Sequence, residues 1–291
     1  MKELKQITVI GLGLLGGSIS LAALRAFPGL KTVGFTHRPS TRRKARQLAV
    51  ASEVSADLKA SVANADIVIL ATPISAFEEI FSQIGNALPK GCIVTDVGST
   101  KVLPHRWAKK TLPKTVCYVG SHPIAGSEQR GVEVARDDLF DNALCILTAT
   151  PKTNRLAVQT LKKFWSAIGC SVKLMSPARH DRILANISHL PHITAVSLVN
   201  AGNSEDLKHA GKGFIDTTRI ASSPVNIWVD VLLTNAGNIT NGIVRITAEL
   251  AKLKKAIKTA DGRQIEKLLE AARKKRNELI DYKMKNKEII S

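Results

Sequence analysis

The sequence predicts an α/β protein in which a doubly wound, largely parallel sheet (residues 1–176) is followed by an all-helical part (residues 177–291). From residue 6 to about 176, short apolar runs alternate with helical stretches, and no convincing strand-like run follows Ser176-Pro177. A glycine-rich turn lies between the first apolar run and the first helix. Such alternation is typical of a sheet covered by helices on both faces. The length of 291 residues allows two domains.

The predicted elements follow from the local pattern. Strand-like runs, short and apolar, occupy 7–10, 32–35, 67–70, 93–95, 116–119, 143–148 and 171–175. Helical patterns between them include 18–26, 75–86 and 154–168. Beyond residue 177, helical patterns cover 178–200, a stretch from about 221 through the 240s, and a charged, heptad-like segment from 246 to the end. The last segment is expected to pack one apolar stripe while its charges face water.

Composition narrows the class of ligand. The net charge is +18, which suits anionic ligands. Nucleic acid is not expected as a partner, because no aromatic side chains interleave with the basic clusters at 38–46 and 273–276.

Cysteines and the N-terminus indicate a cytoplasmic protein. Four widely separated cysteines form no CxxC pair, so neither a metal site nor a disulfide framework is expected. The apolar run 7–24 contains four glycines and no cleavage site follows it, which disfavours a signal peptide or membrane segment.

A dinucleotide-binding fingerprint follows the first predicted strand, in the segment Gly11-Leu12-Gly13-Leu14-Leu15-Gly16-Gly17. Gly11 permits the tight turn, Gly13 lets the backbone approach a pyrophosphate, and Gly16 lets helix and strand pack closely. The helix N-terminus offers N–H groups to the diphosphate. Between a buried strand and an apolar helix, this pattern predicts a Rossmann-type cofactor site that includes Leu14 and Leu15.

The end of the second strand favours NADP. An NAD site usually has an acidic residue about twenty residues after the fingerprint, whereas residues 35–43 contain none. Arg38, Thr41 and Arg42, with His37 beside them, are expected to surround a 2′-phosphate. The alternatives are NAD, or charges that are simply solvated at a helix start. Thr72 and Pro73, after the run 67–70, are expected beside the nicotinamide.

Candidate substrate residues follow further along the chain. His122 lies in a Gly/Pro-rich segment (120–128) expected to be a loop after a strand, where a histidine can exchange a proton, although an incidental surface histidine is the alternative. Ser99 follows the run 93–95. His192 belongs to a helical pattern that Pro191 should kink. Arg219 is bracketed by apolar residues, so its charge needs a partner or an anion.

Taken together, these segments resemble the prephenate/arogenate dehydrogenase family of tyrosine biosynthesis. The matching segments are GLGLLGGS at 11–18, DVGSTK at 96–101, GSHPIAGSE at 120–128, SHLPH at 188–192 and DTTRIA at 216–221. The resemblance implies oxidative decarboxylation of prephenate or arogenate with hydride transfer to NAD(P)+. It implies a homodimer formed through the helical domain, with a small anionic substrate and no membrane partner.

The resemblance also implies residue roles. His122 would take the proton of the substrate hydroxyl, and Ser99 would hydrogen-bond that hydroxyl and His122. His192 would line the nicotinamide–substrate pocket, and Arg219 would bind a carboxylate. Glu128, at the mouth of the site, and Ser127 are further substrate-binding candidates. His189 matches the motif too and has either a binding or a structural role.

Two questions stay open at this point. Some family members carry a basic residue where this chain has Ile215, so the preferred side chain of the substrate, keto acid or amino acid, is undecided. A non-catalytic, NADP-binding redox sensor is an alternative, as is another Rossmann-type dehydrogenase of the hydroxy-acid class. A sensor would not need His122, Ser99 and Arg219 together.

Overall fold

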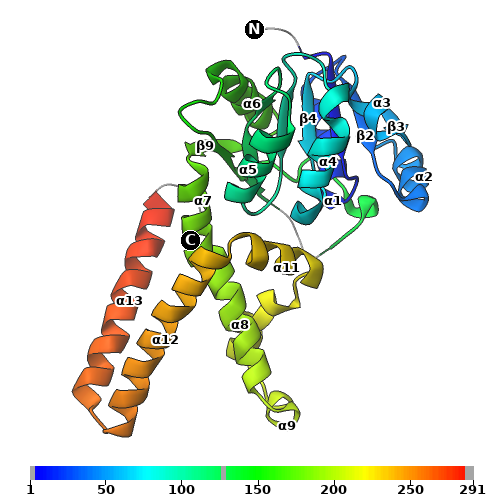
Figure 1. Ribbon diagram of the computed structural model, residues 1–291. Coiled ribbons are helices and arrows are strands. Elements are labelled where there is room, and N and C mark those ends of the chain that lie inside the picture. Colours follow the sequence, from blue (N-terminus) through cyan, green and yellow to red (C-terminus); the bar gives the residue numbers. More distant parts are fainter. Residues whose placement is uncertain (1–3, 126–128, 286–291) are drawn as a thin grey trace. The chain divides into compact units, whose positions relative to one another are not determined.

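The computed structural model describes residues 4–125 and 129–285, and its first sheet has six parallel strands in the order β3-β2-β1-β4-β5-β6 (Figure 1). These strands are β1 (Gln6–Ile10), β2 (Lys31–Phe35), β3 (Glu53–Ser55), β4 (Ile67–Leu70), β5 (Ile93–Asp96) and β6 (Cys117–Tyr118). The order is that of a doubly wound dinucleotide-binding sheet, which confirms the predicted fold class. The short strand β3 has no counterpart among the predicted runs.

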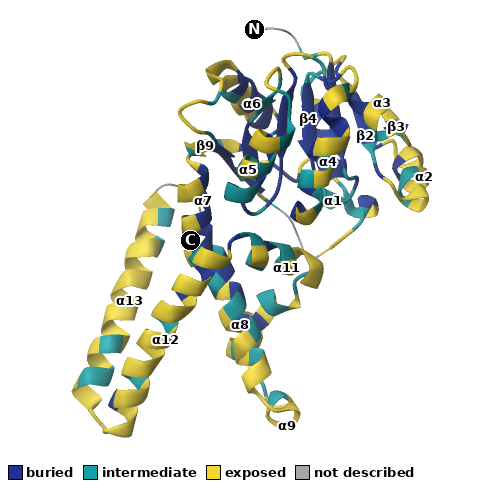
Figure 2. Cartoon of the chain, viewed as in Figure 1, coloured by how far each residue is buried: buried dark blue, intermediate teal, exposed yellow. Residues whose placement is uncertain are grey.

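Helices cover both faces of this sheet. They are α1 (Leu14–Ala26), α2 (Pro39–Gln47), α3 (Leu58–Val62), η1 (Ile74–Ala76), α4 (Phe77–Ile84), η2 (Gly85–Ala87) and α5 (Val102–Thr111). The alternating side chains of β4 divide between two cores: Ile67 and Ile69 pack into one, while Val68 and Leu70 pack into the other. Because both faces are covered, β1 and β4 are buried along their whole length (Figure 2).

His122 lies in a second, three-stranded sheet and not in the predicted loop. This sheet has the order β7-β8-β9, with β7 (Gly120–Ile124) antiparallel to β8 (Leu144–Thr148) and β8 parallel to β9 (Ser171–Met175). The predicted runs 143–148 and 171–175 are therefore strands, but of a separate sheet. The prediction that His122 lies in a loop is wrong, because His122 pairs with Ile146 across the two strands. Pro123 is tolerated because β7 is an edge strand of this sheet.

The segments between these strands are η3 (Val132–Val134) and α6 (Arg155–Ala167). Asn154 caps α6 by accepting hydrogen bonds from the backbone N–H groups of Leu156 and Ala157. The predicted helix at 154–168 is thereby confirmed.

Beyond Met175 the described residues form helices joined by short turns, with no strand among them. The helices are α7 (Pro177–Leu184), the π-helical turn η4 (Ala185–His189), α8 (Leu190–Ala201), α9 (Ser204–Leu207), α10 (Lys212–Thr218), η5 (Arg219–Ser222) and α11 (Val225–Thr234). The predicted irregularity at Pro191 takes the form of η4, the turn directly before it. Proline has no N–H to donate to the preceding turn, and a π turn accommodates that loss.

The chain divides into two compact units, residues 1–239 and 240–291. The second unit contains most of α12 (Ala236–Lys258) and all of the described part of α13 (Gly262–Lys285). The predicted charged segment from residue 246 onward is thus two helices, because Ala260 adopts a φ of 50° and Asp261 caps α13 through the N–H of Gln264. Within residues 4–125 and 129–285, no helix is long and apolar enough to cross a membrane.

Candidate active site

The turn between β1 and α1 forms a cradle for a diphosphate. A Cβ on Gly11, whose φ is +102°, would lie 2.6 Å from the carbonyl oxygen of Ala71, and a Cβ on Gly16 would collide with the carbonyl of Gly11. A Cβ on Gly13 would meet nothing within 4 Å, so this residue borders open space. Gly13 begins α1 without a side-chain cap, and the first turn contains no acidic residue. Leu14 and Leu15 form that first turn, whose N–H groups therefore suit an anion.

The segment after β2 contains the candidate residues for a 2′-phosphate. One guanidinium nitrogen of Arg42, Nη1, donates to the carbonyl oxygens of Thr36 and His37, both at 2.9 Å. With these two hydrogen bonds Arg42 stabilises the backbone of the loop that follows β2. Arg38 is exposed at the N-cap of α2, one turn before Thr41, and becomes the principal candidate for a phosphate.

The end of β4 approaches both the glycine turn and a helix of the C-terminal half. Thr72 lies against Gly11, since a Cβ on that glycine would be 3.0 Å from Cγ2 of the threonine. Pro73 precedes η1, where Ser75 donates its backbone N–H and its hydroxyl to Asp230 on α11, at 3.0 and 2.9 Å. This contact joins α11 to the edge of the sheet where the nicotinamide half of a dinucleotide is expected.

The strand β7 is fastened beside the end of β5. The hydroxyl of Ser121 lies 2.6 Å from that of Thr95 and accepts a hydrogen bond from Trp165 Nε1 at 3.0 Å. Ser99 follows β5 and is half-buried at the same edge. Within the described residues, no hydrogen bond joins Ser99 to His122, and the Nδ1 of His122 contacts His180. The expected role of Ser99 stays a prediction.

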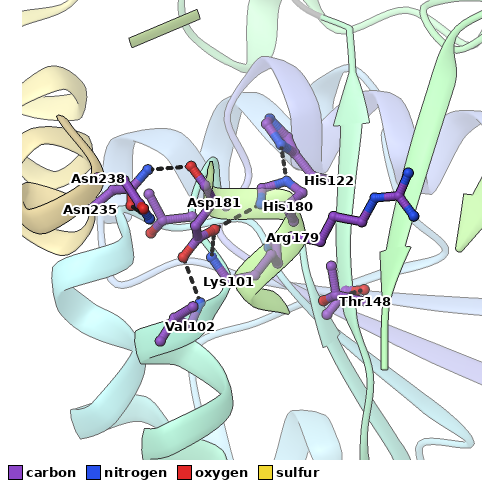
Figure 3. Close-up of polar contacts among 12 residues, drawn as sticks. Lys101, Val102, His122, Thr148, Arg179, His180, Asp181, Asn235 and Asn238 are labelled. Atoms are coloured by element: carbon purple, nitrogen blue, oxygen red, sulfur yellow. Dashed lines mark hydrogen bonds and ion pairs between the residues drawn. The ribbon is translucent and has the colours of Figure 1, made fainter. Parts of the chain in front are cut away.

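A chain of hydrogen bonds extends from His122 into the protein (Figure 3). Its Nδ1 lies 2.9 Å from Nε2 of His180, and Nδ1 of His180 lies 2.8 Å from Oδ1 of Asp181. His180 and Asp181 are buried on α7 and were not predicted from the sequence. Their one visible signal is an acidic residue directly after a histidine at the start of the helical pattern 178–200.

Burial controls the charge of these histidines. It lowers the pKa of His122 well below 6.5, and His180, Lys101 and His189 lower it further. Burial also lowers the pKa of His180, although the hydrogen bond to Asp181 opposes this effect. His122 is therefore neutral near pH 7, the state in which a histidine accepts a proton.

A buried ion pair between Lys101 and Asp96 lies beneath this chain, and both side chains are fully buried. The carboxylate of Asp96 also accepts hydrogen bonds from the Tyr118 hydroxyl at 2.7 Å and from the backbone N–H of Gly98 at 2.9 Å. Because it is paired with Lys101 and its oxygens accept these hydrogen bonds, Asp96 is tolerated in the core and holds the end of β5 in place.

The two histidines of the SHLPH segment have different surroundings. His192 stacks on Trp228 of α11, with ring centroids 3.4 Å apart and planes within 4°. His189 meets the same indole edge-on, and its Nδ1 lies 3.2 Å from the amide nitrogen of Asn235. Burial lowers the pKa of His189 to about 4. His189 therefore has the surroundings of a structural residue, and the sequence analysis missed Trp228.

Arg219 lies at the start of η5, next to the residue whose backbone hydrogen-bonds to His192. Its side chain is exposed, and the nearby Asp216 forms an ion pair with Lys212 at 3.0 Å. Arg219 on η5 and His192 on α8 therefore lie on two neighbouring helices that contact each other. Ser127 and Glu128 lie outside the described residues.

A dinucleotide cradle together with a neutral histidine on β7, a strand that lies beside the end of β5, is typical of a nicotinamide-dependent dehydrogenase. Residues 20–174 match the family model described as the nucleotide-binding domain of prephenate dehydrogenase, and residues 176–271 match the model of its dimerization domain. The chain belongs to the prephenate dehydrogenase family.

Individual relatives agree with this assignment. The chain is 34% identical over 287 residues to prephenate dehydrogenase of Bacillus subtilis, covering 96% of this chain and 77% of the relative. It is 32% identical to cyclohexadienyl dehydrogenase of Zymomonas mobilis, and the alignment covers 90% of this chain and 92% of the relative. It is similar to the crystal structure of Aquifex aeolicus prephenate dehydrogenase in complex with hydroxyphenyl propionate and NAD+, with a TM-score of 0.88, 32% identity, and coverage of 96% and 99%.

Proposed function

We propose that this protein oxidises prephenate, or its amino-acid counterpart arogenate, with loss of CO2, using His122 as the base. The products are 4-hydroxyphenylpyruvate and tyrosine, respectively. The observation that supports this most directly is the position of His122, a neutral histidine on β7 beside the end of β5, in a chain of the prephenate dehydrogenase family.

The chemistry needs one hydride acceptor and one base. A bound nicotinamide supplies the acceptor for the hydride that leaves C4 of the cyclohexadienol ring. His122 takes the hydroxyl proton as the C–O bond gains carbonyl character. The bond from C1 to the ring carboxylate then breaks, and its electron pair makes the ring aromatic and the carbonyl oxygen a phenolate. The proton held by His122 returns to that oxygen, so the base ends the cycle neutral.

The remaining candidate residues orient the substrate. We assign Arg219 to a substrate carboxylate, because a guanidinium matches the geometry of a carboxylate. Ser99 hydrogen-bonds the ring hydroxyl, and His192 lines the pocket beside the nicotinamide. Ser127 and Glu128 stay candidates on the basis of the sequence alone. The net charge of +18 favours capture of the dianion prephenate.

For the cofactor, we propose NADP in preference to NAD. Residues 36–47 contain no carboxylate that would accept hydrogen bonds from the ribose hydroxyls of NAD. Arg38 instead places a positive charge at the N-cap of α2, next to the end of β2. NAD is the alternative.

We also propose a homodimer that forms through the helical part, in keeping with the match of residues 176–271 to a dimerization domain. Large apolar side chains are exposed on its helices, including Val225 at 76%, Leu233 at 71% and Val244 at 64%. A second copy of the chain would cover them. Light scattering across a dilution series should give twice the chain mass. The division of the chain at residue 176 and the cytoplasmic location stay predictions.

The test of the proposed function is an assay of the purified protein with each substrate and each cofactor, in which reduced nicotinamide is followed by its absorbance. We expect turnover of prephenate or arogenate, with the higher efficiency for NADP+. Binding of the cofactor without turnover of either substrate would contradict the proposal and favour the redox sensor. The ratio of the two substrate efficiencies decides between keto acid and amino acid.

A further inference from the structure

We propose that His180 and Asp181 are positioning residues that hold His122 in one tautomer, with the proton on Nδ1 and the lone pair on Nε2. This inference rests on the proposed role of His122 as the base. It assigns a role to two residues of α7 for which, within residues 4–125 and 129–285, no hydrogen bond to the glycine turn at 11–17 is observed.

The argument begins at Asp181, which is an acceptor with fixed partners. Its Oδ1 accepts the backbone N–H of Lys101 at 2.7 Å, and its Oδ2 accepts that of Val102 at 2.8 Å (Figure 3). These two N–H groups begin α5, where the helix dipole favours a negative charge. Asn235 donates to the backbone carbonyl of Asp181 at 2.8 Å. Asp181 is only 1% exposed, so its carboxylate cannot turn away from these donors.

The orientation of this carboxylate determines which ring nitrogen of His180 carries the proton. A carboxylate only accepts hydrogen bonds, so Nδ1 of His180, 2.8 Å from Oδ1, must carry a proton. His180 is fully buried, and burial lowers its pKa, which keeps the ring neutral near pH 7. A neutral imidazole has one donor and one acceptor, so Nε2 of His180 is the acceptor.

The same argument determines which ring nitrogen of His122 carries the proton. Its Nδ1 lies 2.9 Å from the acceptor Nε2 of His180, so Nδ1 of His122 must donate. The neutral ring then has its lone pair on Nε2. A histidine in water prefers the opposite tautomer, with the proton on Nε2, and in that form the nitrogen that would receive the substrate proton is already occupied. The hydrogen bond made by one ring nitrogen thus decides the chemistry of the other.

The elements that carry the three residues are held firmly. The N-terminus of α7 is capped by Ser176, whose hydroxyl accepts the N–H of Arg179 at 3.3 Å. On the other side, β7 pairs along its length with β8. The His122–His180 contact therefore joins two ordered elements that are 58 residues apart in the sequence.

Two variants of His180 separate its two hydrogen bonds. In His180→Asn the amide nitrogen can replace Nδ1 and still donate to Asp181, but nothing reaches Nδ1 of His122. In His180→Gln the amide oxygen can replace Nε2 and accept from His122. We expect kcat to fall at least about tenfold in His180→Asn and to recover most of that loss in His180→Gln. KM for the substrate and the affinity for the cofactor should stay close to those of the unmodified protein.

A spectroscopic measurement on the unmodified protein tests the tautomer directly and does not depend on whether the His180 variants fold. Nitrogen-15 NMR of the imidazole rings, with His122 assigned by its loss in His122→Asn, should show a protonated Nδ1 and a bare Nε2. In His180→Asn the His122 signals should move toward the opposite tautomer. A protonated Nε2 in the unmodified protein would overturn the inference, as would normal kcat in both His180 variants. Normal turnover in His122→Asn would instead overturn the proposed base.

Discussion

His122 combines three properties that suit a base: a ring that is neutral near pH 7 because its pKa is lowered, a partner for one ring nitrogen, and a backbone held in a paired strand. Each property comes from a different neighbour. Burial by the surrounding elements lowers the pKa, His180 engages Nδ1, and the pairing of β7 with β8 fixes the backbone. The proposed role of His122 therefore depends on neighbouring residues that are not expected to take part in the chemistry themselves.

Replacement of His122 by asparagine tests its role. General-base catalysis contributes about 10²- to 10⁴-fold, so kcat of His122→Asn should fall by that order while the cofactor still binds. In the unmodified protein, activity should decline on the acid side, because the base must be neutral. Since burial lowers the pKa of His122, this decline should lie below pH 6.5. Steady-state kinetics across pH will show whether that acid limb disappears in the variant. If it persists, or if kcat stays near normal, His192 becomes the leading candidate for the base.

Replacement of Arg38 and replacement of Arg42 should affect the binding of NADP+ and NAD+ in different ways. Loss of an arginine that pairs with a phosphate costs about 1.5–3 kcal/mol, or roughly ten- to a hundredfold in affinity. Arg38→Ala should raise KM for NADP+ by that factor and leave KM for NAD+ nearly unchanged. Arg42→Ala should weaken both cofactors, because Nη1 of Arg42 holds the carbonyls of Thr36 and His37. Equal efficiency with both cofactors in the unmodified protein would contradict the NADP preference.

At the scale of the element, local sequence patterns predict the strand–turn–helix unit well but predict β7 poorly. The run 7–10 and the glycines after it place β1 and α1 correctly, because the constraint lies within one short segment. The segment 120–124 contains Gly120 and Pro123, which locally favour a turn. It becomes a strand because β8, whose paired residues are 20 to 28 positions away in the sequence, supplies its hydrogen bonds.

Two glycine substitutions should separate folding from cofactor binding within that unit. In Gly16→Ala the new methyl group would collide with the carbonyl of Gly11, so α1 must move from β1 and stability should fall by about 1–3 kcal/mol. In Gly13→Ala the methyl group meets no protein atom within 4 Å, so stability should hold. It would occupy the space expected for the diphosphate, and we expect about a tenfold loss of cofactor affinity. Urea unfolding and fluorescence titration measure the two effects. A destabilised Gly13→Ala that binds the cofactor normally would refute this division.

At the scale of the whole molecule, buried neutral histidines couple stability to pH. Burial lowers the pKa values of His105 and His189 from 6.5 to about 4. In the unfolded chain these rings take up protons near pH 6.5. In the native state they take up protons only near pH 4. Their stabilisation is therefore complete above pH 6.5 and is lost as the pH falls toward 4. For the almost fully buried His189 the loss is about 3 kcal/mol.

Urea unfolding at a series of pH values measures this coupling. In His189→Asn the amide oxygen can still accept the hydrogen bond from Asn235, but the residue no longer titrates. We expect a shallower decline of stability between pH 6.5 and 4.5 than in the unmodified protein, with the exposed His37→Asn as the matched control. An identical slope in His189→Asn would show that the burial of this ring does not govern the acid sensitivity.

The fold class, the dinucleotide cradle and the family could be predicted from the sequence, because each depends on residues close together in the chain. Tertiary structure alone decided that β7 joins a second sheet, that Arg42 binds its own loop and that His180 and Asp181 lie behind His122. Two of these three depend on pairing between segments far apart in the sequence, and the third on the path of a loop. Local periodicity carries no information about which distant donor will meet which acceptor. The candidate base His122 could therefore be named from its motif, whereas its contact with His180, and that of His180 with Asp181, could only be seen once the chain was folded.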